Sequence, residues 1–300
     1  GTSLPETETY LQALEEVKDY LYVLFPTRED THLRFILNGP YRTNPSRESI
    51  LDDDDFNLSL RDETVNLLSS ALPTLRDKGF LSPPGLAVFP NDDDDIPPFY
   101  RPLRDRIYEA FRNRKLTPTW QEKGHGHCKA LSLVDGPEEL KRHLTLGDLK
   151  TWVGDGMPAS PRWVCTAEDR RSERFLRSLR IKQFGWEELL DCISSQNNSN
   201  KLLKWLESKQ NHQCQEIYAL LDDAEKRTRQ GLWKLERRPI VRAADGQHRR
   251  GDTLYFQTEA GGTDGGVFPK VEPGVYSAGK DPELKKKVRA FLKNLGVREI

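Results

Sequence analysis

The sequence predicts a mixed α/β fold of the α+β type, in which an N-terminal part precedes two copies of a small α/β unit. One observation is the alternation of Leu33, Phe35 and Leu37 with other side chains, which has the period of a strand. A second is a series of apolar stripes at helical spacing. The third is a pattern of proline, turn glycine and strand that occurs twice after residue 115.

The N-terminal part is expected to open with a helix and a pair of strands. The helical stripe consists of Tyr10, Leu11, Leu14, Val17 and Leu21. We expect strands at residues 22–25 and 33–37, separated by a polar turn at residues 26–31.

Two further helices follow in this part of the chain. The first starts at Ser59, carries the stripe Val65, Leu68, Leu72 and Leu75, and includes Pro73, which can kink it. Gly79 followed by Phe80 is typical of a glycine C-cap. Residues 81–98 are rich in Pro and Asp and are interpreted as a linker, and the next helix turns Leu103, Ile107 and Phe111 inward.

The internal repeat defines the remaining organisation. Residues 116–120 precede Gly124, and residues 238–242 precede Gly246 at nearly the same spacing. Each copy closes with a similar helix, at residues 175–181 and at residues 291–297. We therefore predict four segments: an N-terminal domain, a first α/β repeat, a helical insert and a second repeat, at residues 1–115, 116–185, 186–237 and 238–300.

Composition narrows the class of protein. Apolar residues make up 36% and charged residues 31%, and 46 Lys and Arg balance 47 Asp and Glu, so no overall basic charge indicates nucleic acid. No apolar run approaches the ~20 residues of a membrane span, so no membrane partner is expected. Four scattered cysteines and no signal-peptide pattern favour free thiols and a cytoplasmic location. Because the chain does not begin with Met, we expect it to be a segment of a longer protein.

The most informative motif runs from Asn44 to Ile50. An arginine on an irregular segment beyond a sheet edge can point its planar guanidinium at an anion, and Arg47 occupies that place. Ser46 can cap the turn, and Glu48 can hold the guanidinium. A surface arginine without a ligand is the alternative.

This motif, N-x-S-R-E-x-[IL], resembles the phosphate-sensing stretch in the middle domain of Hsp90-type chaperones. A longer run is similar to sacsin-like proteins, which carry an ATPase domain of the histidine-kinase (GHKL) type. The residues that carry this resemblance are Phe25-Pro26-Thr27, Thr31, Leu33-Arg34-Phe35, Pro40-Tyr41 and Arg47-Glu48-Ser49-Ile50. The close match covers roughly residues 22–80.

The resemblance implies a non-catalytic middle or transducer region rather than a complete enzyme. Arg47 would reach the γ-phosphate of ATP in an upstream GHKL domain of the same polypeptide, with Asn44 and Ser46 shaping the loop and Glu48 supporting the arginine. The α/β units would relay the conformational change to a partner or client protein. The chain lacks the Glu and Asn helix, D-x-G-x-G motif and glycine-rich lid of a GHKL site, and it lacks a Walker A motif. ATP and Mg²⁺ are therefore implied for the missing domain, and no cofactor is expected on this chain alone.

Three other features of the sequence bear on function. His125, His127 and Cys128, with His212 and Cys214, are metal-capable, but their spacing is not that of a zinc site, and no metal is predicted. Asp52–Asp55, Asp92–Asp95, Asp155-Gly156 and the glycine run 261–266 are interpreted as loops. Two alternative functions remain open. One is an ATP-independent protein-interaction scaffold, and the other is nucleic-acid binding through short basic clusters. These clusters comprise Arg101/Arg104/Arg106, Arg170/Arg171, Arg237/Arg238, Arg249/Arg250 and Lys285–Lys287.

Overall fold

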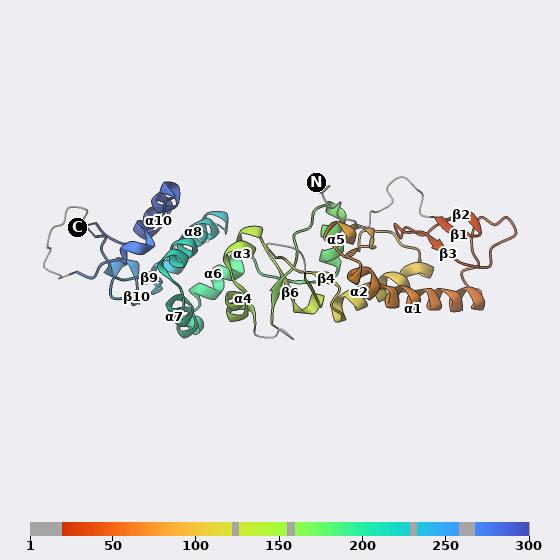
Figure 1. Ribbon diagram of the computed structural model, residues 1–300, viewed down its shortest axis with the longest axis horizontal. Helices are drawn as coiled ribbons and strands as arrows, with labels where there is room; N and C mark the ends of the chain where they lie inside the picture. The colour runs from red at the N-terminus through yellow and green to blue at the C-terminus, as the bar shows by residue number, and fades with distance from the viewer. Residues whose placement is uncertain (1–19, 122–125, 155–159, 229–232, 258–267, 300) are drawn as a thin grey trace, which may run out of the picture. The chain divides into compact units, whose positions relative to one another are not determined.

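The computed structural model describes residues 20–121, 126–154, 160–228, 233–257 and 268–299 (Figure 1). The chain divides into two compact units. Unit 1 comprises residues 1–135 and 157–182, and unit 2 comprises residues 136–156 and 183–300. The fold is a mixture of helices and small sheets, as the α+β class requires. Within the described ranges, no helix combines the length and the apolar character needed to cross a bilayer.

The described residues of unit 1 form three α-helices, three short 3₁₀ helices and most of the strands. In chain order these are β1 (Tyr20–Val23), β2 (Phe25–Asp30), β3 (Leu37–Asn38), α1 (Asp55–Asp77), η1 (Pro84–Val88), η2 (Pro98–Tyr100), α2 (Arg101–Asn113), β4 (Thr117–Pro118), β5 (His127–Cys128), η3 (Ala130–Ser132), β6 (Leu133–Asp135), β7 (Arg162–Trp163), α5 (Arg170–Ser178) and, at its boundary, β8 (Lys182–Gln183).

Unit 2 is mainly helical. Its elements are α3 (Glu138–His143), α4 (Leu146–Val153), α6 (Trp186–Ser194), η4 (Gln196–Asn198), α7 (Ser199–Glu207), α8 (Asn211–Thr228), α9 (Trp233–Glu236), β9 (Val241–Arg242), β10 (His248–Arg249), η5 (Gly251–Thr253), η6 (Pro273–Val275) and α10 (Pro282–Asn294). Helix α8 packs against α6, which precedes it in the chain, and against α10, which follows it.

The N-terminal sheet differs from the sequence expectation. Its order is β2-β1-β3, with β1 antiparallel to β2 and parallel to β3. Leu21, expected on a helix, lies in β1, and residues 26–30, expected as a turn, belong to β2, where Thr27 donates its hydroxyl to the Leu21 carbonyl (2.8 Å). Residues 10–19 of the expected helix lie outside the described residues.

The expected strand at residues 33–37 is mostly irregular. His32 and Arg34 have φ angles of 53° and 60°, which interrupt an extended chain, so only Leu37 and Asn38 pair with β1. Leu33 and Leu37 are nonetheless buried, as the alternation predicts, and they pack with Val65 of α1 and Leu103 of α2. The sheet and these two helices thus share one core.

Helix α1 shows how local sequence sets its ends. The Asp54 carboxylate accepts the Asn57 amide at its start, four residues earlier than expected. At its end, Gly79 has φ of 78°, the Gly79 amide bonds the Arg76 carbonyl, and the Phe80 amide bonds the Leu75 carbonyl. This pair of bonds is the Schellman arrangement and confirms the predicted glycine C-cap. The helix continues through Pro73.

The predicted linker at residues 81–98 is wrong, because its apolar residues form part of the core. Leu81 and Leu86 have no exposed surface. The Phe89 ring contacts the rings of Phe111 (5.0 Å between centroids) and Phe175 (5.2 Å). The acidic run following them is anchored as well, since Asp94 accepts two hydrogen bonds from Arg171, each 3.0 Å.

The two stretches interpreted as repeats share part of their element order, although the first also contains the strands β6 to β8 and the helices α3 and α4, and the second contains η6. β4 and β5 form an antiparallel pair, as do β9 and β10, and each pair is followed by a 3₁₀ turn. A further strand segment lies antiparallel in each copy, through the bridges Thr119–Val164 and Ala243–Val271. Each copy then closes with a helix, α5 in unit 1 and α10 in unit 2. The helical insert expected between them contains α6 to α9.

The residue that follows each closing helix has a left-handed backbone conformation, but the two residues are of different types. Arg180 after α5 has φ of 55°, and Gly296 after α10 has φ of 93°. The Arg180 amide bonds the Arg177 carbonyl, and the Gly296 amide bonds the Lys293 carbonyl, both at 2.9 Å. Only glycine adopts this left-handed conformation without steric strain, so the first copy is strained where the second is not.

We predict opposite effects of exchanging these residues. Arg180→Gly should leave the free energy of unfolding unchanged or raise it by up to about 1 kcal/mol, whereas Gly296→Arg should lower it by about 1–2 kcal/mol. A Cβ at Gly296 would also lie 3.3 Å from the backbone of Asp252. Urea denaturation measures both, and Arg180→Ala, which keeps the Cβ, is the control. A stabilising Gly296→Arg substitution would contradict this account.

The histidines at the paired position of the two copies have different surroundings. The Nε2 atom of His127 in β5 lies 2.8 Å from the Leu81 carbonyl oxygen. Both ring nitrogens of His248 in β10 are buried without a hydrogen-bond partner among the described residues. Burial, and secondarily the charge of Arg242 opposite, lowers the pKa of His248 to about 4.

Acid should therefore destabilise the chain through His248. Between its unfolded pKa of 6.5 and its folded pKa of about 4, the unfolded chain binds the extra proton, so the free energy of unfolding falls as the pH decreases through this window. His248→Leu should flatten that slope in urea titrations at pH 7 and pH 5. An unchanged slope would show that His248 does not titrate as a buried group.

Candidate functional site

The Asn44–Ile50 motif forms a compact loop closed by its own first residue. Thr43 and Ile50 form an antiparallel β-bridge, and the backbone N–H of Asn44 donates to the Ser49 carbonyl (2.9 Å). Asn44 Oδ1 accepts from Ser46 Oγ and from the Glu48 amide, both at 3.0 Å, and Asn44 Nδ2 donates to Ser49 Oγ (3.0 Å). Asn44 and Ser46 thus shape this loop.

Arg47 lies at the exposed turn of this loop. Its amide donates to the Asn44 carbonyl (2.9 Å), and its φ of 58° is left-handed. Its side chain is exposed, and no partner for its guanidinium is found among the described residues. A non-glycine residue in this region costs about 1–2 kcal/mol, and the Asn44 hydrogen bonds oppose that cost.

Glu48 does not hold the Arg47 guanidinium, contrary to the sequence expectation. Its Oε1 atom accepts from Arg28 Nη1 of strand β2 at 2.6 Å. The Arg28 amide also donates to the Glu48 carbonyl (3.0 Å), so the loop is tied to β2 at two points. Because Glu48 pairs with Arg28, no described carboxylate compensates the charge of Arg47.

A groove of about 780 Å³ lies between this loop and the β1–β2 hairpin. Arg42, Ser46, Arg47 and Glu48 line one side, and Leu24 and Phe25 lie on the hairpin side. Leu24 is 88% exposed and Phe25 71% exposed. Leu24 forms the hairpin tip with a φ of 64°. A large apolar residue that is both exposed and left-handed is unusual, because such tips favour glycine or asparagine.

A half-buried acid, Glu29, contacts the loop. Glu29 Oε2 accepts from the Ile50 amide (3.4 Å), and Arg42 Nη1 pairs with the helix cap Asp54 (3.1 Å). Burial raises the pKa of Glu29 above its ordinary value, while the Ile50 hydrogen bond opposes this shift. Arg28 and Arg42 thus each have a carboxylate, which leaves Arg47 as the groove arginine available to an external anion.

Two residues that line the groove, Leu24 and Arg47, have left-handed backbone conformations. Four of the five described non-glycine residues with positive φ lie between residues 24 and 47, and they are Leu24, His32, Arg34 and Arg47. Such outliers cluster at ligand-binding and switch regions, where surrounding contacts stabilise them. Arg47 could be identified from the sequence motif. The exposure of Leu24 and Phe25 could not be predicted, because an apolar pair beside a strand is ordinarily buried.

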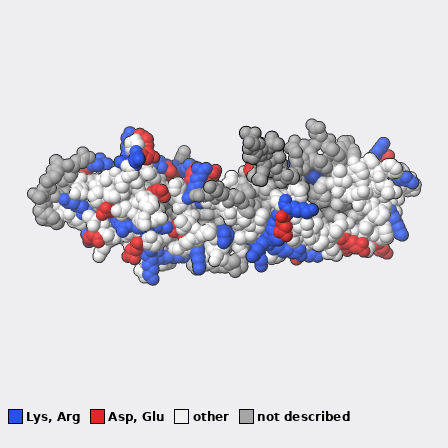
Figure 2. Space-filling model, in the orientation of Figure 1, with Lys and Arg blue, Asp and Glu red and all other residues white. Residues whose placement is uncertain are grey.

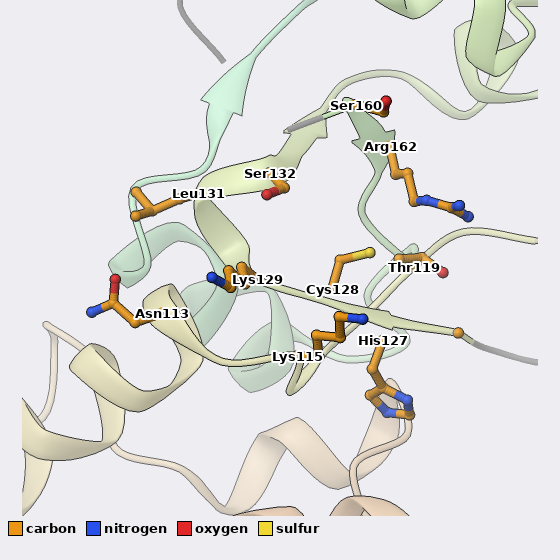
Figure 3. A pocket seen from close by; sticks show the side chains of 11 residues that line it. Asn113, Lys115, Thr119, His127, Cys128, Lys129, Leu131, Ser132, Ser160 and Arg162 are labelled. Atoms are coloured by element: carbon orange, nitrogen blue, oxygen red, sulfur yellow. The ribbon is translucent and has the colours of Figure 1, made fainter. Parts of the chain in front are cut away.

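A second hollow, of about 600 Å³, lies in the first repeat (Figure 3). Lys115, Lys129 and Arg162 line it, together with Cys128. His127 points out of this group and toward Leu81, whose carbonyl it contacts. Its neighbour His125 lies outside the described residues.

The metal interpretation gains no support from these side chains. Cys128, Cys165, Cys192 and Cys214 are free thiols, and Cys214 is buried beside Arg242. Among the described residues, His, Cys, Asp and Glu side chains form no group able to hold a metal ion. The Asp155-Gly156 and 261–266 turns lie outside the described residues.

Most of the basic clusters are engaged in local interactions. Arg104 pairs with Asp105, Arg106 with Glu109, Arg250 with Asp252, and Lys287 with Asp223. Arg238 donates instead to the Ser195 carbonyl (3.0 Å). On the face shown in Figure 2, basic and acidic side chains are interspersed rather than gathered into one continuous basic surface. Nucleic-acid binding through one of these clusters stays an alternative that these interactions do not test.

Comparison with models of protein families, with curated proteins and with solved structures finds no match to this chain.

We predict that Asn44 is needed for the conformation of the loop. Asn44→Ala removes the acceptor of the Ser46 hydroxyl and the Glu48 amide, and should lower the free energy of unfolding by about 1–2 kcal/mol. Faster amide hydrogen exchange at Arg47 and Glu48 is the local measurement. Asn38→Ala, at an exposed position in β3, is the matched control. Unchanged exchange in Asn44→Ala would show that the loop does not depend on this side chain.

Proposed function

We propose that this chain is the region following the nucleotide-binding domain of a sacsin-like, Hsp90-type ATPase, and that Arg47 contacts the γ-phosphate of ATP in that domain. The observation that supports this most is the exposed Arg47 side chain on the Asn44 loop, whose guanidinium has no partner among the residues that the structure describes. A planar guanidinium with five donors suits the oxygens of a terminal phosphate. In this proposal the N-terminal part is Hsp90-middle-like and the protein is cytoplasmic.

The surroundings of Arg47 suit docking against another module. Leu24 and Phe25 supply exposed apolar surface within the same groove, and burying them would stabilise a complex. Excluding water from the groove would strengthen the attraction between the arginine and an anion, because the local dielectric falls. The apolar tip and the arginine would therefore act together.

The chemistry expected of Arg47 is electrostatic. ATP and Mg²⁺ would be held by the upstream domain, and this chain would supply one positive charge to the terminal phosphate as charge shifts during transfer. The Asn44 hydrogen bonds would fix the loop before docking, so little conformational entropy is lost on contact. Loss of the γ-phosphate would remove one contact and allow the two modules to separate. The α/β repeats would relay this conformational change to a partner or client.

A second candidate function is ATP-independent protein interaction. It is favoured by the exposure of Leu24 and Phe25, which would bury apolar surface against any complementary partner. In that case the arginine would contribute charge complementarity at the rim, and nucleotide would not change the affinity for the partner.

We predict a selective loss of ATP turnover in the longer protein that carries this region beside its ATPase domain. Arg47→Ala and Arg47→Gly should each lower the steady-state rate at least about tenfold while leaving nucleotide binding nearly unchanged. Arg47→Gly also relieves the left-handed strain, so a loss of rate in this variant cannot be attributed to a damaged fold.

The control is Arg106→Ala, which removes an arginine paired with Glu109 on α2 and away from the groove lining. Wild-type turnover in both Arg47 variants would refute the proposed contact. Wild-type turnover with impaired partner binding in Leu24→Asn would favour the ATP-independent function.

A further inference from the structure

The hollow of about 600 Å³ in the first repeat has a basic lining (Figure 3). Its basic side chains are Lys115, Lys129 and Arg162, which come from different segments of unit 1. All three are exposed, and none forms an ion pair with a described residue. No described residue of the lining is acidic. The described part of the lining therefore carries three positive charges and no negative charge.

The strand register brings a hydroxyl to the same face as the arginine. Thr119 forms an antiparallel bridge with Val164, which follows Arg162 by two residues in an extended segment. Because side chains alternate along a strand, Thr119, Val164 and Arg162 emerge on one face. Figure 3 shows the Thr119 hydroxyl and the Arg162 guanidinium turned to the same side. A diagonal pair of this kind is within the reach of a long side chain, so both groups can contact one ligand.

The Thr119 hydroxyl lacks a hydrogen-bond partner. Thr119 is 2% exposed, and its Oγ1 atom is buried without a partner among the described residues. Leaving a buried hydroxyl unpaired costs about 1–3 kcal/mol. The neighbouring Gly126 keeps the space beside it open, since a Cβ at that glycine would lie 3.1 Å from Thr119 Oγ1. An oxygen atom of a bound anion would accept the missing hydrogen bond.

The second repeat forms the same strand pairing without these groups. Ala243 occupies the position of Thr119, because each follows the first strand of its hairpin and each bridges a valine. By the same register, Pro269 occupies the position of Arg162. The scaffold therefore folds without a hydroxyl or a guanidinium at these positions. A ligand explains their presence in the first repeat better than a structural requirement does.

The chemistry of the lining favours a phosphate group. The Arg162 guanidinium can donate two parallel N–H groups to two phosphate oxygens, and Lys115 adds a point charge. Asn113, Ser132 and Ser160 also line the hollow, whereas no described aromatic ring does, so a nucleobase would find no ring to stack on. The volume exceeds the size of a phosphate ion and lies within the range of small-molecule sites. The hollow thus has room for a phosphate and a polar remainder.

We infer that this hollow binds the phosphate group of a small phosphomonoester through Lys115, Arg162 and the Thr119 hydroxyl, with Lys129 adding to the positive potential. The site is independent of the proposed role of Arg47, because Arg47 lines a different groove. Free inorganic phosphate presents the same chemistry, so the test compares the two sources.

Isothermal titration of this chain with glucose 6-phosphate, at about 0.15 M salt, tests the inference. We expect saturable binding with a stoichiometry of about one, weaker binding of inorganic phosphate, and no binding of glucose. Phosphate binding at least as tight as that of glucose 6-phosphate would overturn the phosphomonoester as the ligand in favour of the free ion.

Three variants assign the binding to named groups. Arg162→Ala should lower the affinity for glucose 6-phosphate at least about tenfold. Thr119→Val removes the hydroxyl and keeps the shape of the side chain, so it should lower the affinity about threefold without lowering the free energy of unfolding. Arg170→Ala is the control, because it removes an exposed arginine of the same unit outside the lining, and it should change the affinity less than about twofold.

Alkylation of Cys128 tests where the ligand lies. This half-buried thiol lines the hollow, so bound glucose 6-phosphate should slow its reaction with N-ethylmaleimide. Cys192, a half-buried thiol of unit 2, should react at an unchanged rate, and peptide mass spectrometry measures both. Absence of saturable binding, wild-type affinity of Arg162→Ala, or an unprotected Cys128 in the saturated protein would overturn the inference.

Discussion

The hydrogen bonds of the Asn44 side chain are the constraint on which the proposed function depends. One amide group accepts from Ser46 and from the Glu48 backbone and donates to Ser49, so it determines the path of a seven-residue loop. That path places Arg47 in a left-handed conformation with its side chain in solvent. The pairing of Glu48 with Arg28 then leaves Arg47 uncompensated. A short polar network thus fixes both the position and the charge of the candidate site.

Patterns with a purely local cause were the most predictable parts of the fold. The glycine C-cap at Gly79, the inward face of α2 and the burial of Leu33 and Leu37 follow from periodicity and backbone stereochemistry. The N-terminal sheet was harder to predict, because its irregular segment contains left-handed His32 and Arg34, which no strand pattern indicates. The prediction of a linker at residues 81–98 was wrong for another reason. Its prolines suggested an irregular, exposed chain, whereas Leu81, Leu86 and Phe89 pack in the core.

The candidate site was predictable in its residues but not in its contacts. The order of Asn44, Ser46 and Arg47 indicated a loop presenting an arginine, whereas the partner of Glu48 comes from β2, twenty residues earlier in the chain. The exposure of Leu24 and Phe25 depends on the hairpin geometry and has no signal in the sequence.

In the proposed function, Arg47 contacts the terminal phosphate of a nucleotide bound to a neighbouring module. The most direct measurement is calorimetric binding between this chain and the proposed upstream GHKL-type domain, loaded either with a non-hydrolysable ATP analogue or with ADP. The account predicts at least about tenfold tighter binding in the ATP-like state, and loss of that difference in Arg47→Gly. Equal affinity for the two nucleotide states of the wild-type pair would contradict it.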